Sequence, residues 1–514
     1  MKAGRVISGD EQEAKAEAKR IVGDARAEAD RLLLDANVLA QRVVSDARAS
    51  AERVAAEAQH RNVPNPTAGP TAGSTIAGEP ITEATPHATG TVDEVTGLVV
   101  RATVPGVALG ELVKIDRRDR TPGDPASPAA ALLGAEVVGF RGEQAVLVPL
   151  GELAGVAPAA TVWRTGAPLA IACSDALLGR VLDGIGEPID GGAPLTGETW
   201  IVDRPAPAAL ARPPIRAPQP TGVRAIDAML TLGRGQRVGL FAAAGVGKST
   251  LLGQIARGTT ADVIVLCQVG ERGRELAELL GNELASARAR TVVVCATSDA
   301  PPLVRLRAIH VATAVAEWFR DRRGASVLLL CDSLTRVARA QREVGLSAGE
   351  PPARHGYPPS VFALLPRLIE RAGATATGVI TALYTVLVAG NDLDEPIADE
   401  VRGLVDGHII LDRRLAARGH FPPIDVVASG SRLMDRVVDA RHAEAAARVR
   451  KRLAIYEEHR DLIALGAYQA GRDRALDDAV TAYPAIERVL QQRRDEPAEW
   501  DAVVGSLLTL ARPH

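Results

Sequence analysis

The chain has 514 residues, of which 46% are hydrophobic and 24% charged, values typical of a globular protein with about three domains. Sixty Lys and Arg against 63 Asp and Glu give a net charge of -3, so no basic footprint for nucleic acid stands out. No apolar run reaches the roughly 18 residues that a membrane span requires, and the charged N-terminus lacks the apolar core of a secretory signal. We therefore expect a cytoplasmic protein that binds no nucleic acid.

Aromatic residues are scarce: there are only 14 Phe, Trp and Tyr, and none precedes Phe140. The first quarter of the chain therefore cannot hold an ordinary aromatic-anchored core. The four cysteines lie far apart in the sequence, and three of them lie in Val/Leu/Ile runs: Cys173, Cys267, Cys295 and Cys331. We interpret them as small buried apolar residues rather than as a disulfide framework or a zinc site.

Residues 1–60 contain an eleven-residue repeat. An acidic residue recurs at Glu13, Asp24, Asp35 and Asp46, with Ala one position later and Arg at 20, 31, 42 and 53. Eleven residues in three turns is about 3.67 per turn, which favours a right-handed helical supercoil. We predict a packed helical stalk, self-paired or partner-paired, and the alternative is a single solvated helix. The periodicity resembles the peripheral-stalk helices of rotary ATP synthases and the stator-like regulator of type III export ATPases.

The composition changes three more times along the chain. Half of residues 61–86 are Pro, Gly or Thr, which indicates a flexible to semi-extended linker. Short Val/Leu/Ile runs separated by Gly and Pro predict a small β-barrel or sandwich over 87–171, with 120–130 as an excursion between strands. Apolar strand-like runs alternating with amphipathic helices over 172–434 predict an α/β domain, a parallel sheet with helices on both faces. Residues 435–514 read as helical throughout.

The strongest motif is AAAGVGKST, which follows the strand-like run RVGLF and opens a predicted helix. Glycines there let the backbone wrap a phosphate, Lys248 reaches the β- and γ-phosphates, and the Ser249 hydroxyl ligates Mg²⁺. Ala242 stands where the strict pattern has Gly. The predicted nucleotide-binding residues of this loop are Ala244, Gly245, Val246, Gly247, Lys248, Ser249 and Thr250.

Two acidic residues follow other predicted strands. Asp332 ends SVLLLCD, about 80 residues after the loop, which suits the carboxylate that orients the Mg²⁺ water shell. Glu271 follows VLCQVG and suits the carboxylate that orients and polarises the attacking water. Taken alone, either residue could simply end a strand.

These motifs, with GYPPSVFALLPRLIERAG and DEPIADEVRGLVDGHIILDR, resemble the flagellar and type III secretion export ATPase family, sister to the catalytic subunits of rotary ATP synthases. The resemblance spans about residues 90–495, and the family tolerates Ala at position 242. It implies a RecA-like P-loop core after a β-barrel, acting as a Mg²⁺-dependent ATPase that energises protein unfolding and export as a homohexamer. It also implies a γ-phosphate contact for Arg272, adenine stacking for Phe421, and an arginine finger that reaches the neighbouring subunit for Arg432.

The implied partners are exported proteins and their chaperones, a stator-like regulator and a membrane export apparatus, which places the protein at the inner face of the cell membrane. Residues 1–86 lie outside the family's ATPase, so we predict a stalk-like helix fused in cis. Two alternatives are the catalytic subunit of a rotary ATP synthase and a non-catalytic nucleotide-binding scaffold. The 349–373 segment argues against the first, and the joint presence of Lys248, Glu271, Asp332 and Arg432 argues against the second.

Overall fold

The computed structural model describes residues 87–117, 132–388 and 393–512. The chain divides into two units, residues 1–82 and 83–514, and every described residue belongs to the second unit. The predicted stalk over 1–60, the linker over 61–86 and the excursion over 120–130 lie outside the described residues.

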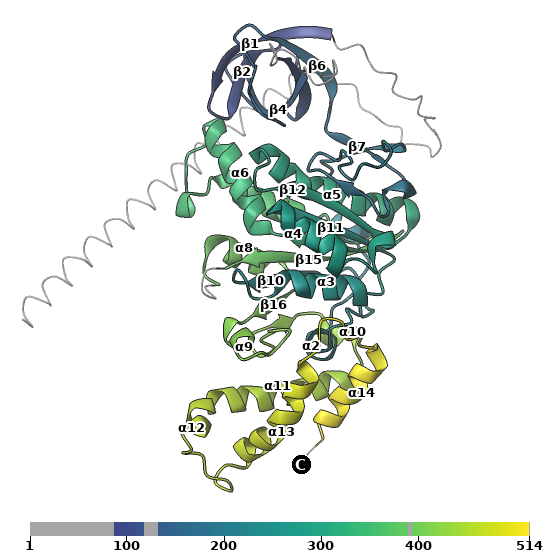
Figure 1. Ribbon diagram of the computed structural model, residues 1–514, viewed down its shortest axis with the longest axis vertical. Coiled ribbons are helices and arrows are strands. Elements are labelled where there is room, and N and C mark those ends of the chain that lie inside the picture. The colour runs from purple at the N-terminus through teal and green to yellow at the C-terminus, as the bar shows by residue number, and fades with distance from the viewer. Residues whose placement is uncertain (1–86, 118–131, 389–392, 513–514) are drawn as a thin grey trace, which may run out of the picture. The chain divides into compact units, whose positions relative to one another are not determined.

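The first described element is a closed six-stranded barrel with the strand order β1-β2-β5-β4-β3-β6 (Figure 1). Small β-branched and aliphatic side chains fill it, among them Val100, Ile115 and Leu147, so this barrel needs no aromatic core. The predicted β-barrel is thereby confirmed. Its strands are β1 (His87–Thr96), β2 (Val99–Thr103), β3 (Glu111–Asp116), β4 (Leu132–Arg141), β5 (Gln144–Pro149) and β6 (Thr161–Pro168).

A nine-stranded sheet forms the central layer, with the order β17-β16-β10-β15-β13-β11-β12-β8 and β14 paired to β15. All neighbours are parallel except β14 and β17. The strands are β8 (Val181–Leu182), β10 (Arg237–Ala242), β11 (Val263–Glu271), β12 (Thr291–Thr297), β13 (Ser326–Asp332), β14 (Gly373–Ala374), β15 (Val379–Leu387), β16 (Gly407–Leu411) and β17 (Gly430–Ser431). A separate two-stranded sheet pairs β7 (Ala170–Cys173) with β9 (Glu198–Ile201).

Both faces of the sheet are buried, because successive strand residues supply two different cores. Along β11, Val263 and Val265 face one core, whereas Ile264 and Leu266 face the other. The first core contains α5 (Pro302–Arg323), α6 (Leu334–Ala348), α7 (Pro359–Ile369) and α8 (Pro396–Leu404). The second contains α2 (Arg224–Met229), α3 (Lys248–Gly258) and residues of the C-terminal helices. This two-faced parallel sheet confirms the predicted α/β class.

The C-terminal region is helical, as predicted, although residues 491–499 between its last two helices are not. Its helices are α10 (Met434–Val437), α11 (Ala440–Glu458), α12 (Arg460–Ala464), α13 (Arg474–Leu490) and α14 (Trp500–Leu510). The remaining short elements are α4 (Gly273–Glu278), a π-helical turn (Leu279–Glu283), α9 (Arg413–Ala417) and 3₁₀ turns at Asp175–Leu177, Ala209–Ala211, Arg288–Arg290 and Arg354–Gly356.

All four cysteines are free and buried, as expected. No helix in the described part of the chain combines the length and apolar character that a bilayer-spanning helix needs.

Candidate active site

The glycine-rich loop lies between β10 and α3, at the carboxyl edge of the parallel sheet. Gly245 and Gly247 have φ values of 79° and 97°, in the left-handed region that residues with a Cβ adopt only at a cost. Space is open around both Cα atoms, so a ligand can approach the backbone there. Gly247 caps α3, and the first N–H groups of that helix therefore face the loop. This geometry is that of an anion-binding loop.

Lys248 lies between two carboxylates that the sequence separates widely. Its ammonium contacts Asp332 at the end of β13 and lies 3.5 Å from Glu271 at the end of β11. The carboxyl ends of parallel strands meet at one edge of the sheet, which explains the convergence. Thr385 of β15, the strand between β10 and β13, donates a hydrogen bond to Asp332 at 2.9 Å.

Glu271 is 9% exposed, and burial raises the pKa of its carboxyl, with Asp332 acting in the same direction and Lys248 and Arg336 opposing. Arg336, one turn into α6, lies 3.0 Å from its Oε2. Sequence reasoning did not single out Arg336. The available signal was its place four residues after Asp332, at the start of the helix that follows β13.

The site suits Mg²⁺ chemistry. One Asp332 oxygen contacts Lys248 and Thr385, whereas within the described residues the other, Oδ2, is buried without a hydrogen-bond partner. The Ser249 hydroxyl belongs to the first turn of α3, beside the same loop. No cluster of three or more His, Cys, Asp or Glu suited to a metal occurs among the described residues. Magnesium needs none in a nucleotide site, because phosphates and water supply most of its ligands.

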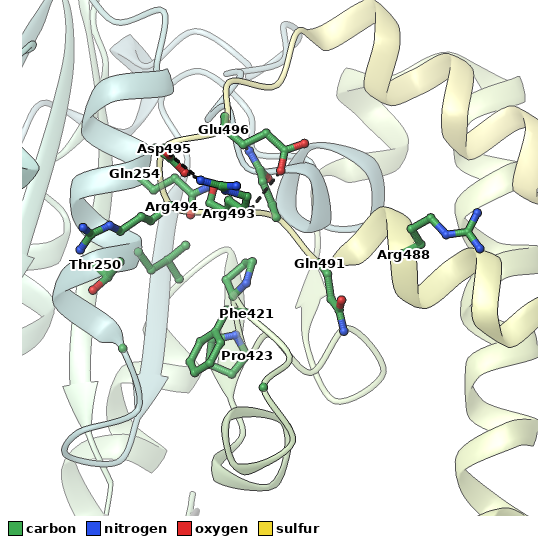
Figure 2. A pocket seen from close by; sticks show the side chains of 15 residues that line it. Thr250, Gln254, Phe421, Pro423, Arg488, Gln491, Arg493, Arg494, Asp495 and Glu496 are labelled. Atoms are coloured by element: carbon green, nitrogen blue, oxygen red, sulfur yellow. Dashed lines mark hydrogen bonds and ion pairs between the residues drawn. The ribbon is translucent and has the colours of Figure 1, made fainter.

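Two cavities adjoin the loop. One, of about 700 Å³, is lined by loop residues Ala244, Gly245, Gly247, Lys248, Ser249 and Thr250, by Glu271, and by Arg272, Arg336 and Arg494. The other, of about 760 Å³, is lined by Thr250, Phe421, Pro422, Pro423 and the segment 491–496 (Figure 2). Val246, also in the loop, is buried. The predicted Phe421 is half-exposed in the second cavity, where a base could stack on it.

The two predicted arginines, Arg272 and Arg432, make no contact with Lys248, Glu271 or Asp332 that the structure records. Arg272 has a side chain that is 70% exposed in the first cavity, 3.9 Å from Glu275. Arg432 is exposed after β17, donates to the Arg402 carbonyl at 3.4 Å, and lines neither cavity. The segment 491–496 was missed, because its run of Gln, Arg and Asp reads as the solvated end of a helix.

A glycine loop between a strand and a helix, a lysine at its end and carboxylates on two neighbouring strands define a P-loop nucleoside triphosphatase. Three family models match the chain: the ATP synthase alpha/beta family β-barrel domain over 92–166, the nucleotide-binding domain of that family over 222–431, and the T3SS EscN ATPase C-terminal domain over 438–509. The chain belongs to the flagellar and type III secretion ATPase family.

Individual proteins and structures that are similar to this chain belong to the same family. The type 3 secretion system ATPase of Xanthomonas euvesicatoria is 50% identical, over 80% of this chain and 91% of its own. The flagellum-specific ATP synthase of Bacillus subtilis is 46% identical, over 82% and 94%. The structure of the assembled ATPase EscN from enteropathogenic E. coli has a TM-score of 0.76 and 41% identity, covering 82% of this chain and all of that one. The protein is therefore an ATPase of type III export, and the synthase-subunit and scaffold alternatives are not favoured.

Proposed function

We propose that the chain hydrolyses Mg-ATP at the interfaces of a homohexamer, with the residues of the P-loop site in the roles that their chemistry suggests. The observation that carries the proposal is the convergence of Lys248, Glu271 and Asp332 at one glycine loop. The EscN structure is described as assembled, which supports the oligomeric form.

The roles follow from charge and position. The loop amides and Lys248 bind the phosphates, and Phe421 stacks on adenine. Ser249 and Asp332 hold Mg²⁺, which neutralises charge on the phosphates when bound. Glu271 orients and polarises the attacking water, and Arg336 holds the Glu271 carboxylate in place. Arg272 contacts the γ-phosphate within the subunit.

Arg432 completes the site of the adjacent subunit. Its guanidinium is exposed and lies outside both cavities of its own chain, which fits a residue that acts in trans. An arginine beside the transferred phosphoryl group offsets the charge that develops there. Hydrolysis then depends on assembly.

We further propose that the chain is organised into five parts: a stalk over 1–60, a linker over 61–86, the barrel over 87–171, the ATPase domain over 172–434 and a helical domain over 435–514. One EscN structure is described as a complex with its central stalk EscO, which supports a stalk partner here. The other proposed partners are exported proteins, their chaperones, a stator-like regulator and a membrane export apparatus. The proposed location is cytoplasmic, peripheral at the inner face of the membrane.

The test combines two inactive variants. Glu271→Gln keeps the arginine finger and removes the base, whereas Arg432→Ala keeps the base and removes the finger. Each variant alone should bind ADP and hydrolyse ATP at least about a hundredfold more slowly. Hexamers assembled from an equal mixture should recover up to about a quarter of the wild-type rate, because that share of head-to-tail interfaces pairs an intact base with an intact finger.

Mixtures that stay as inactive as their parents would refute the trans role of Arg432. Normal hydrolysis by Glu271→Gln alone would refute the role of Glu271. A mixture of Glu271→Gln with Lys248→Ala is the matched control, because Lys248 and Glu271 belong to the same subunit's site and every site in the mixture therefore lacks one of them. It should stay inactive.

A further inference from the structure

We call the cavity of about 700 Å³ that contains Lys248 the phosphate cavity, and the cavity of about 760 Å³ that contains Phe421 the base cavity. Three residues line both cavities: Gly247, Thr250 and Arg494. Arg494 is the only charged residue of the three. It belongs to the non-helical segment after α13, far from the glycine loop in sequence. On the nucleotide site proposed above, we propose that Arg494 contacts the nucleotide directly and binds its α-phosphate.

The position of the junction identifies the group that Arg494 meets. Phe421 lies in the base cavity, and Lys248 lies in the phosphate cavity. The α-phosphate joins the nucleoside to the β-phosphate, so a nucleotide that fills both cavities has its α-phosphate at their junction. Thr250, at the start of α3, also lines both cavities and therefore lies at the same junction.

The backbone of Arg494 is anchored to α3. Arg257 of α3 donates to the Arg494 carbonyl at 2.6 Å, and Gln254 of the same helix donates to the Arg493 carbonyl at 3.4 Å. The position of Arg494 relative to the loop is therefore fixed by the helix that carries the loop. Figure 2 shows Arg494 on the Thr250 side of the base cavity, with Arg488 on the opposite side.

The Arg494 side chain is available for a ligand. It is 73% exposed and lies 4.0 Å from Glu283, a loose contact compared with the 2.8 Å between Arg257 and the same carboxylate. Two cations of the same cavity are held more closely: Lys248 contacts Asp332, and Arg336 lies 3.0 Å from Glu271. Arg272 is exposed as well and lies 3.9 Å from Glu275. A planar guanidinium with several donors matches phosphate oxygens well.

The experiment measures binding of ADP, 2'-deoxy-ADP and GDP to the full-length protein by calorimetry. Arg494→Ala should weaken all three by the same factor, about five- to tenfold, because all three carry the α-phosphate. AMP, which carries the α-phosphate alone, should lose the same factor, and no loss with AMP would assign Arg494 to the β-phosphate and overturn the inference. The affinity for ATP, measured with a slowly hydrolysed analogue, should fall by the same factor as the affinity for ADP. Arg494→Lys should recover part of the loss, and raised salt should weaken wild-type binding more than binding by Arg494→Ala.

Two controls separate this inference from the nucleotide site itself. Arg448→Ala removes an exposed arginine from α11, outside both cavities, and should bind like wild type. Lys248→Ala should lose binding; if it does not, the proposed site is wrong. If Lys248→Ala loses binding and Arg494→Ala does not, only the inference is overturned. A loss confined to ADP and absent with GDP, or absent with 2'-deoxy-ADP, would assign Arg494 to base or ribose and also overturn it.

Discussion

At the residue scale, the carboxylate proposed to polarise the attacking water depends on the charges that surround it. Glu271 lies at the end of a buried strand, and burial raises its pKa. Lys248 and Arg336 oppose that effect from two elements, the start of α3 and the start of α6. A water-polarising carboxylate must be ionised, and these two cations favour its ionised form.

Arg336→Ala tests this arrangement. Losing the cation 3.0 Å from Glu271 should raise the pKa of that carboxyl further, because Arg336 lowers it in the intact protein. Activity is lost as pH falls through this pKa, so the acidic limb of the kcat profile should move to higher pH. At neutral pH, kcat should fall on the order of tenfold, while ADP affinity changes little.

Steady-state hydrolysis from acidic to alkaline pH provides the measurement. Arg339→Ala, which removes an exposed arginine from the same helix, is the matched control and should reproduce the wild-type profile. An Arg336→Ala profile that superimposes on that of the control would show that Arg336 does not set the ionisation of Glu271.

At the element scale, the segment after α13 ties the C-terminal helices to the nucleotide site. Gln492 is buried. Its side-chain Nε2 donates hydrogen bonds to the carbonyls of Gly222 at 2.9 Å and Glu496 at 2.8 Å, and its Oε1 accepts one from the Arg224 N–H at 2.8 Å. Its backbone N–H donates to the Phe421 carbonyl at 2.8 Å. One residue is therefore bonded both to the backbone of Phe421 and within the segment that carries Arg494.

Gln492→Ala should loosen this connection. It leaves several buried polar groups without partners, which costs about 1–3 kcal/mol of unfolding free energy. The ADP affinity should fall as well, because Phe421 and the 491–496 segment lose their common support. Thermal unfolding with and without ADP, together with calorimetric binding, measures both effects. Gln469→Ala, an exposed glutamine between α12 and α13, should change neither quantity, and identical behaviour of the two variants would contradict the prediction.

Sequence patterns predicted elements better than the contacts between them. The runs RVGLFA and SVLLLCD became β10 and β13 at the expected residues, because continuous aliphatic runs between helices indicate strands buried on both faces. The two-residue strand β8 was missed, since two residues show no period. Arg336 and Arg494 were also missed: an arginine near a helix end looks the same in sequence whether it meets solvent or a site more than 60 residues away.

At the scale of the whole molecule, all the proposed site residues lie within the unit of residues 83–514. The barrel is joined to the α/β part by Arg307 of α5, whose Nε donates to the buried Glu136 of β4 at 2.7 Å. The C-terminal helices are joined by Arg450 of α11, which donates to the Met229 carbonyl at 2.7 Å. The proposed chemistry uses no residue of 1–60, so we propose another purpose for the eleven-residue repeat.

Deleting residues 1–60 tests that purpose, since the proposed stalk packs through its Ala columns. The truncated chain should retain the wild-type ADP affinity and the wild-type rate once assembled. It should need a higher protein concentration to form hexamers, or should no longer associate with the membrane complex. Sedimentation across a concentration series, activity at each concentration and co-purification with membranes measure these effects. A full-length variant with Lys at Ala14, Ala25, Ala36 and Ala47 keeps the length and breaks one packing column, so it should share the defect. If assembly and association survive both changes, residues 1–60 are a solvated helix without a packing partner.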